Sequence, residues 1–162
     1  YIQCAKLLSF PYLADKICKS LANKIKKRFK GIDLILAPAM GGVIIGYEIG
    51  KLLKKETIFC ERVNGKFVLR RGFNIKKGAR VLIIEDVITT GKSSIESAVC
   101  VNGFGGKVLG LAAIIDRSSH LLKFNFPFIP VAKIDAPIFS QDQIPDYLKN
   151  IPAVKPGSRF IK

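Results

Sequence analysis

Residues 81–94 read VLIIEDVITTGKSS: an apolar run, two adjacent acids, and a turn of small residues around Gly91. A short, continuously apolar run is typical of a strand that is buried on both faces of a sheet. A glycine-containing turn at the start of a helix offers backbone N–H groups to an anion, and the Thr and Ser hydroxyls here add further donors. The stretch therefore predicts a buried strand that ends in two acids beside a phosphate site.

The pattern of this strand and turn recurs along the chain. Helices are predicted at residues 12–29, 41–54 and 94–104, and strands at residues 33–37, 57–60, 80–84, 108–115 and 128–134. Alternation of apolar strands with helices predicts an α/β doubly wound domain, with a parallel sheet of about five strands flanked by helices. Such sheets bind ligands beyond the carboxyl ends of their strands, where the 81–94 stretch has its acids and its turn.

One segment does not fit the alternation. Residues 61–77 are rich in charge and glycine, and Asn64-Gly65 is a strong hairpin turn signal. Residues 67–69 are a candidate return strand, which predicts a small mobile hairpin beside the sheet. Residues 1–5 resemble the middle of a strand, and since the chain starts without Met, we expect that an upstream segment is missing.

Composition limits the classes of function. The chain has 162 residues, of which 49% are hydrophobic, so we expect a single domain that spans residues 1–162. No apolar run is long enough to cross a bilayer, and no signal-peptide pattern opens the chain. The four cysteines lie far apart without metal-binding spacing, which is typical of a reduced cytoplasmic protein.

The formal net charge of +15 favours an anionic partner, either a phosphorylated small molecule or nucleic acid. Much of this charge lies in residues 24–30, KIKKRFK, where lysines interleave with apolar residues at helical spacing. This is the pattern of the solvated face of an amphipathic helix. We therefore expect no nucleic-acid partner and no membrane partner.

The turn itself permits two interpretations. Gly91-Lys92-Ser93 suggests the nucleotide-binding Walker A motif, but that motif needs a glycine at position 86, where this chain has Asp. Ser93 and Glu96 have the spacing of a helix capping box, which predicts that a helix starts near Ser93 or Ser94. The turn is thus either a phosphate cradle or a plain helix cap.

Glu85 and Asp86 should face opposite sides of the strand, because neighbouring strand residues alternate. Two acids beside a phosphate site would repel phosphate unless they bind something that lies next to it. Sugar hydroxyls donate to carboxylates, and a Mg²⁺ ion could share the site. The alternative is a pair of solvent-exposed acids at a strand end.

The 81–94 stretch resembles the 5-phosphoribosyl 1-pyrophosphate (PRPP) motif of type I phosphoribosyltransferases. The variant EDVITTGKS resembles the orotate phosphoribosyltransferases within that family. The segments PAMGGVIIGYEIG, LRRGF, AAIIDRS and KPGSR also resemble this group, and the resemblance runs from residue 1 to about residue 159.

The resemblance implies roles for the matching residues. Glu85 and Asp86 would hold the ribose hydroxyls, with Mg²⁺ held mainly by PRPP and lying near these acids. Thr89 would also approach orotate, and the planar fork of Arg117 would hold the orotate carboxylate; the alternative is a surface Arg117 paired with Asp116. The residues implied in PRPP binding are Glu85, Asp86, Val87, Ile88, Thr89, Thr90, Gly91, Lys92, Ser93, Ala39, Met40, Gly41 and Gly42.

The resemblance also implies that residues 61–71 form a catalytic loop that closes over the pyrophosphate, in the site of the neighbouring subunit of a homodimer. Arg62 and then Lys66 are the catalytic candidates. Val63 occupies a position where the family often has a cation, so this loop departs from the usual pattern. The resemblance further implies an upstream segment that helps to enclose orotate, and we expect this segment to be missing here, which would leave the orotate pocket incomplete.

The function implied is transfer of the phosphoribosyl group from PRPP to orotate, giving orotidine 5′-monophosphate and pyrophosphate in pyrimidine synthesis. The expected enzyme is a Mg²⁺-dependent, cytoplasmic pentosyltransferase. Two alternatives stay open: another purine or pyrimidine phosphoribosyltransferase, and a PRPP-sensing regulator on the same fold that binds nucleic acid.

Overall fold

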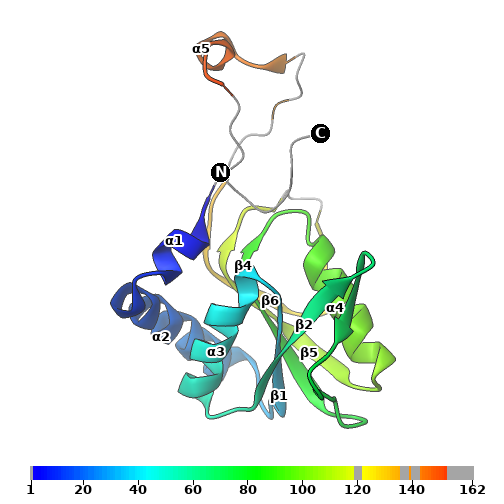
Figure 1. Cartoon of the computed structure of the whole chain (residues 1–162). Coiled ribbons are helices and arrows are strands. Elements are labelled where there is room, and N and C mark those ends of the chain that lie inside the picture. The colour runs from blue at the N-terminus through cyan, green and yellow to red at the C-terminus, as the bar shows by residue number, and fades with distance from the viewer. Residues whose placement is uncertain (1, 119–121, 136–138, 140–142, 153–162) are drawn as a thin grey trace.

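The fold is a six-stranded sheet between two layers of helices (Figure 1). The computed structural model describes residues 2–118, 122–135, 139 and 143–152. Its elements are α1 (Cys4–Leu8), α2 (Pro11–Arg28), β1 (Leu34–Pro38), α3 (Gly41–Leu53), β2 (Thr57–Val63), β3 (Lys66–Leu69), β4 (Arg80–Ile88), α4 (Lys92–Gly103), β5 (Lys107–Asp116), β6 (Phe128–Lys133) and α5 (Asp146–Lys149).

The strand order is β3-β2-β1-β4-β5-β6, and every neighbouring pair is parallel except β2 with β3. The predicted α/β class and the flanking helices are confirmed. The predicted count of about five strands becomes six, because the return strand of the hairpin pairs with β2 and extends the sheet.

Each face of the sheet has its own apolar core. Helices α1, α2 and α3 cover one face, and α4 covers the other (Figure 1). Successive β4 residues alternate between the two cores, as strand geometry requires: Leu82 and Ile84 face α2 and α3, whereas Val81 and Ile83 face α4. This alternation decides where the acids at the end of the same strand point.

The N-terminal segment differs from the prediction. Residues 1–5 were predicted to be extended, but Cys4–Leu8 is a helix. Cys4 and Leu8 are both buried, and their i, i+4 spacing puts them on one helical face against the core. Within the described part of the chain, no helix combines the length and apolar character that a membrane-spanning segment needs.

Close packing of α3 on the sheet gives a first prediction. A Cβ atom at Gly50 would overlap Thr57 Oγ1 and lie 3.1 Å from the Lys55 carbonyl oxygen. We expect Gly50→Ala to lower the melting temperature by about 3–10 °C, the effect of overpacking by about 1–3 kcal/mol. Circular dichroism measures this change. Gly103→Ala is the matched control, because a Cβ there meets nothing within 4 Å. An equal melting temperature for Gly50→Ala and wild type would contradict the packing argument.

Candidate active site

The carboxyl ends of the parallel strands bring the predicted site segments to one edge of the sheet. Pro38 at the end of β1 pairs with Cys60 in β2, and Ile88 at the end of β4 pairs with Asp116 at the end of β5. The residues that follow these strands therefore lie at the same edge. These are the loop of residues 39–42, the turn of residues 89–93, and Arg117.

Glu85 and Asp86 lie inside β4, because the strand continues to Ile88 rather than ending at residue 84 as predicted. They point to opposite faces of the sheet. Glu85 is only 6% exposed and has the parity of Val81 and Ile83, which places it on the α4 face. Asp86 is half-buried on the α3 face: a Cβ at Gly41 would lie 2.8 Å from its Oδ2. The alternative of solvent-exposed acids is wrong for this pair.

Burial shapes the electrostatics of the pair. Desolvation, followed by the neighbouring Asp86 carboxylate, raises the pKa of Glu85 to about 8, and desolvation also raises the pKa of Asp86. Among the described residues, neither acid forms an ion pair, and Asp86 Oδ1 accepts one hydrogen bond, from the Val87 N–H at 2.9 Å. Such an acid pair suits a ligand that brings hydroxyl donors or a cation.

The raised pKa of Glu85 gives a second prediction. The folded protein keeps this proton between the ordinary pKa of 4.5 and about 8, whereas the unfolded chain loses it. Stability from this group is therefore present at low pH and lost as pH rises through 8. In the ligand-free protein, Glu85→Gln should exceed wild type in free energy of unfolding at pH 9, by an amount on the order of a few kcal/mol, and match it near pH 5. Urea unfolding of both proteins at both pH values measures the difference in free energy of unfolding. The same difference between the two proteins at both pH values would contradict the prediction.

The 39–42 loop runs from β1 into α3, directly beside Asp86. The Ala39–Met40 peptide bond is cis, and the Met40 side chain is 84% exposed. The Ala39 N–H donates to the Cys60 carbonyl at 2.8 Å, so this amide is engaged within the protein. The amides of Gly41 and Gly42 belong to the first turn of α3. The N–H groups of a first turn have no carbonyl of a preceding helical turn to bind.

The 89–93 turn connects β4 to α4. Gly91 is the N-cap with φ of +69°, and α4 begins at Lys92. The Lys92 N–H lies 3.4 Å from Thr90 Oγ1, and Thr89 and Thr90 are exposed. Of the three remaining residues predicted to bind PRPP here, Val87 and Ser93 are half-buried, and Ile88 is buried in the core.

The predicted capping box is wrong. Gly91, not Ser93, is the N-cap of α4 and has no side chain to cap the helix, and Glu96 forms ion pairs with Arg62 and Lys92. Two cations compete successfully for this carboxylate, and Gly91 adopts the left-handed conformation that starts the helix one residue early. Gly91 thus offers no side-chain acceptor, and of the first-turn amides the Lys92 N–H has Thr90 Oγ1 at 3.4 Å. Such a helix start suits an anion.

Arg117 lies beside Thr89, because each follows one member of the paired residues Ile88 and Asp116. The Arg117 N–H donates to the Ile88 carbonyl at 2.8 Å. Pairing of Arg117 with Asp116 was the alternative, but Asp116 Oδ1 accepts from the Ser118 N–H at 2.9 Å and from the Ser118 hydroxyl at 2.6 Å.

Within the described part of the chain, Arg117 Nε is buried without a hydrogen-bond partner. A buried, unpartnered guanidinium nitrogen indicates that this side chain is placed for a ligand. Ser118, which orders the Asp116 carboxylate next to it, was missed from the sequence, although Asp-x-Ser after a strand is a recognisable turn pattern.

The two loop candidates lie in the β2–β3 hairpin. Arg62 forms an ion pair with Glu96 of α4, and its guanidinium carbon lies 4.3 Å from the centroid of the Phe67 ring. Lys66 is exposed and pairs across the hairpin with Val63. The structure thus brings Arg62 to α4, where its partner is Glu96, a pairing that no pattern in the sequence indicates. His120 and the KPGSR segment at residues 155–159 lie outside the described residues.

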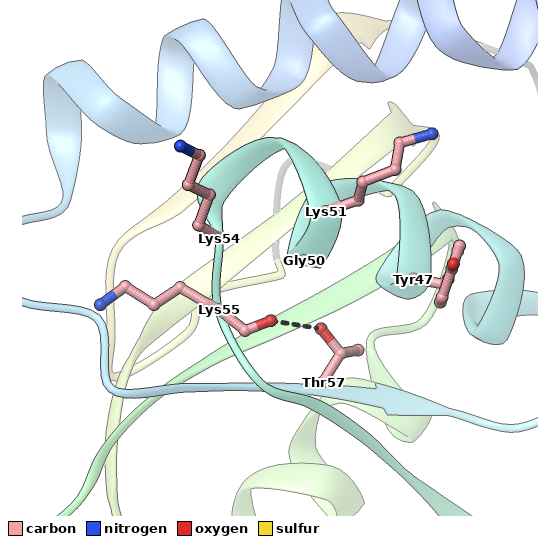
Figure 2. Close-up of a pocket in the computed structure, with 6 residues that line it drawn as sticks. All are labelled: Tyr47, Gly50, Lys51, Lys54, Lys55 and Thr57. Atoms are coloured by element: carbon pink, nitrogen blue, oxygen red, sulfur yellow. Dashed lines mark hydrogen bonds between the residues drawn. The ribbon is translucent and has the colours of Figure 1, made fainter.

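A hollow of about 390 Å³ lies at the opposite edge of the sheet, where α3 ends and β2 begins (Figure 2). Three lysines line it, Lys51, Lys54 and Lys55, but their side chains extend in different directions and do not converge on one guest. A second hollow, of about 510 Å³, lies between α4 and residues 123–126. Neither hollow includes the acid pair or the 89–93 turn.

Known proteins resemble this chain in sequence and in fold. Residues 7–144 match the family model of the phosphoribosyl transferase domain. The orotate phosphoribosyltransferases of Erythrobacter litoralis and Sphingopyxis alaskensis are 43% and 45% identical to this chain over 160 and 163 residues. The alignments cover 98% and 99% of this chain and 83% of each relative.

A solved structure, orotate phosphoribosyltransferase from Aeropyrum pernix, has a TM-score of 0.68 and 20% identity, over 83% of this chain and 78% of its own. At this identity the likeness supports the fold alone. The full-length alignments with the curated relatives carry the assignment further: the chain belongs to the orotate phosphoribosyltransferases, within the phosphoribosyltransferase family.

Proposed function

We propose that this protein transfers the 5-phosphoribosyl group of PRPP to N1 of orotate, giving orotidine 5′-monophosphate and pyrophosphate, a step of pyrimidine synthesis. The observation that carries the proposal is the position of Arg117. The Arg117 side chain is half-buried, its Nε is buried without a hydrogen-bond partner among the described residues, and it lies at the strand end beside Thr89. Orotate is the base that brings a carboxylate to such a group.

PRPP would lie along the carboxyl edge of the sheet. The 89–93 turn would bind the 5-phosphate, because it combines first-turn amides of α4 with the exposed hydroxyls of Thr89 and Thr90. Glu85 and Asp86 would accept from the ribose hydroxyls. The 39–42 loop, whose Gly41 backbone lies against Asp86, would offer the amides of Gly41 and Gly42 to the pyrophosphate, because the Ala39 N–H is already bonded to the Cys60 carbonyl.

Magnesium fits this site. Burial and the absence of an ion pair among the described residues leave Glu85 and Asp86 without a compensating cation. A Mg²⁺ ion that arrives with PRPP would be held mainly by phosphate oxygens and would have these carboxylates nearby. It would supply charge neutralisation for the pyrophosphate as it leaves.

The protein's own part in the reaction is to bind and orient. The bond from the anomeric carbon to pyrophosphate breaks ahead of bond formation with orotate N1, which leaves positive charge on the ribose. Orotate N1 is acidic enough to arrive deprotonated, so no general base is needed. Arg117 and Thr89 would orient the ring, and Arg62 and Lys66 would stabilise the leaving pyrophosphate.

We further propose that the enzyme is a cytoplasmic homodimer in which the hairpin of one subunit serves the site of its partner. A complementation experiment tests the sharing. Arg62→Ala and Arg117→Ala homodimers would each be nearly inactive, and mixing and reassembling them would restore activity if the two residues act in the same site from different subunits. Mixtures that stay as inactive as the separate variants would show that each hairpin serves its own subunit.

Base selectivity tests the function itself. The protein is incubated with PRPP, Mg²⁺ and either orotate, uracil, hypoxanthine or adenine, and pyrophosphate release is followed. We expect release with orotate alone. Release with a purine or with uracil, but not with orotate, would favour another phosphoribosyltransferase. Salt-sensitive binding of nucleic acid without any turnover would favour the regulator.

A further inference from the structure

Strand alternation fixes where Arg62 points. In β2, Ile58 and Cys60 are buried on the α4 face of the sheet, and Arg62 is the next residue of the same parity. Its side chain accordingly lies towards α4. The guanidinium donates through Nη2 to Glu96 Oε2 and through Nη1 to the Gly65 carbonyl at 2.6 Å. It also stacks over Phe67.

Glu96 lies one turn beyond Lys92, the first residue of α4, so it belongs to the helix that carries the 89–93 turn. One carboxylate oxygen binds Arg62, and the other lies 3.9 Å from Lys92 Nζ. Glu96 therefore connects the tip of the β2–β3 hairpin to the first turn of the phosphate helix.

The base of the hairpin is held independently of this contact. Arg71 donates to both oxygens of Glu61, at 3.1 Å and 2.9 Å, and the Phe67 side chain is buried. The side chains of Arg62 and Glu96 are 33% and 26% exposed. Ion pairs with such exposure are weak enough to exchange partners. Breaking the Arg62–Glu96 pair would thus free Arg62 without undoing the hairpin.

We propose that Glu96 is a positioning residue that holds Arg62 on α4 until pyrophosphate takes its place. This inference rests on the proposed function, in which Arg62 is a cation for the pyrophosphate of PRPP. Two donors of the Arg62 fork are already engaged, so a pyrophosphate group must compete with the Glu96 carboxylate for them. The same competition applies whether Arg62 serves its own site or that of a partner subunit.

The test is a double-mutant cycle with inorganic pyrophosphate and PRPP as ligands, measured by isothermal titration calorimetry in the presence of Mg²⁺. Glu96→Gln should lower both dissociation constants about two- to fivefold, because an exposed ion pair no longer opposes the release of Arg62. In an Arg62→Ala background, Glu96→Gln should have no effect. Glu96→Asp, which keeps the charge, should stay within about twofold of wild type.

Two controls separate the proposed holding of Arg62 by Glu96, called the latch below, from a general effect of removing one negative charge. Ribose 5-phosphate has no pyrophosphate, so its affinity should not change in Glu96→Gln. Asp33→Asn removes the carboxylate of another Arg–carboxylate pair, Arg80–Asp33, at the opposite edge of the sheet, and should leave all three affinities unchanged. Asp33→Asn changes the net charge of the protein by the same amount as Glu96→Gln.

Three results would overturn the latch. The first is unchanged affinity of Glu96→Gln for pyrophosphate and PRPP. The second is the same gain in the Arg62→Ala background, and the third is an equal gain in affinity for ribose 5-phosphate. The last two would mean that Glu96 acts only through its own charge. Absence of PRPP binding by the wild-type protein is a different result. It would reject the proposed function, and the latch with it.

Discussion

Replacing Arg117 with alanine should raise the KM for orotate by about 100-fold or more and leave the dissociation constant of PRPP close to that of wild type. A bidentate, charge-assisted pair between guanidinium and carboxylate contributes about 1.5–3 kcal/mol for each hydrogen bond, and alanine removes both. Arg117 follows β5, outside the 39–42 loop and the 89–93 turn, and its backbone N–H donates to the Ile88 carbonyl. Steady-state kinetics and PRPP titration measure the two quantities separately.

The matched variant is Arg117→Lys, which keeps the charge and loses the planar fork. It should fall between wild type and Arg117→Ala in orotate KM. An equal loss of PRPP affinity and orotate affinity in Arg117→Ala would show that this residue supports the whole site rather than the orotate carboxylate.

Asp86→Asn should weaken PRPP binding about 10- to 100-fold, because hydrogen bonds from ribose hydroxyls to a charged acceptor are lost. The same change should raise the melting temperature of the ligand-free protein, since it removes a partly buried acid that forms no ion pair among the described residues. Calorimetric titration and thermal unfolding give the two readings.

Opposite signs for affinity and stability would distinguish a ligand-binding acid from a structural one. Asp33→Asn at the far edge of the sheet serves as the control, because Asp33 is paired with Arg80 and should lose stability without changing PRPP affinity. An unchanged affinity of Asp86→Asn for PRPP would show that Asp86 does not bind this ligand.

The sequence was sufficient for the sheet because its strands are continuously apolar. Apolar runs such as residues 81–84 and 111–114 have few alternatives to a position between two helical layers, so a parallel sheet with flanking helices could be predicted. The length of β4 was underestimated because acids usually end a buried strand, and here Glu85 is buried with its pKa raised.

Contacts between distant segments could not be predicted in the same way. The S-x-x-E spacing of Ser93 and Glu96 is compatible with a capping box, but the outcome depends on which donors compete for the carboxylate. Arg62 lies in the β2–β3 hairpin, 34 positions before Glu96 in the sequence. The sequence around Glu96 does not predict its contact with Arg62. The contact follows from the alternation of side chains along β2, once the position of that strand beside α4 is known.

Consumption of orotate is the most direct test of the central claim, that the acid pair, the 89–93 turn and Arg117 form one site for PRPP and orotate. The protein is mixed with orotate, Mg²⁺ and PRPP, and orotate absorbance and pyrophosphate are followed to completion. We predict that orotate disappears only when PRPP is present, with one pyrophosphate formed for each orotate consumed. Unchanged orotate absorbance, in a sample that binds PRPP by calorimetry, would contradict the account.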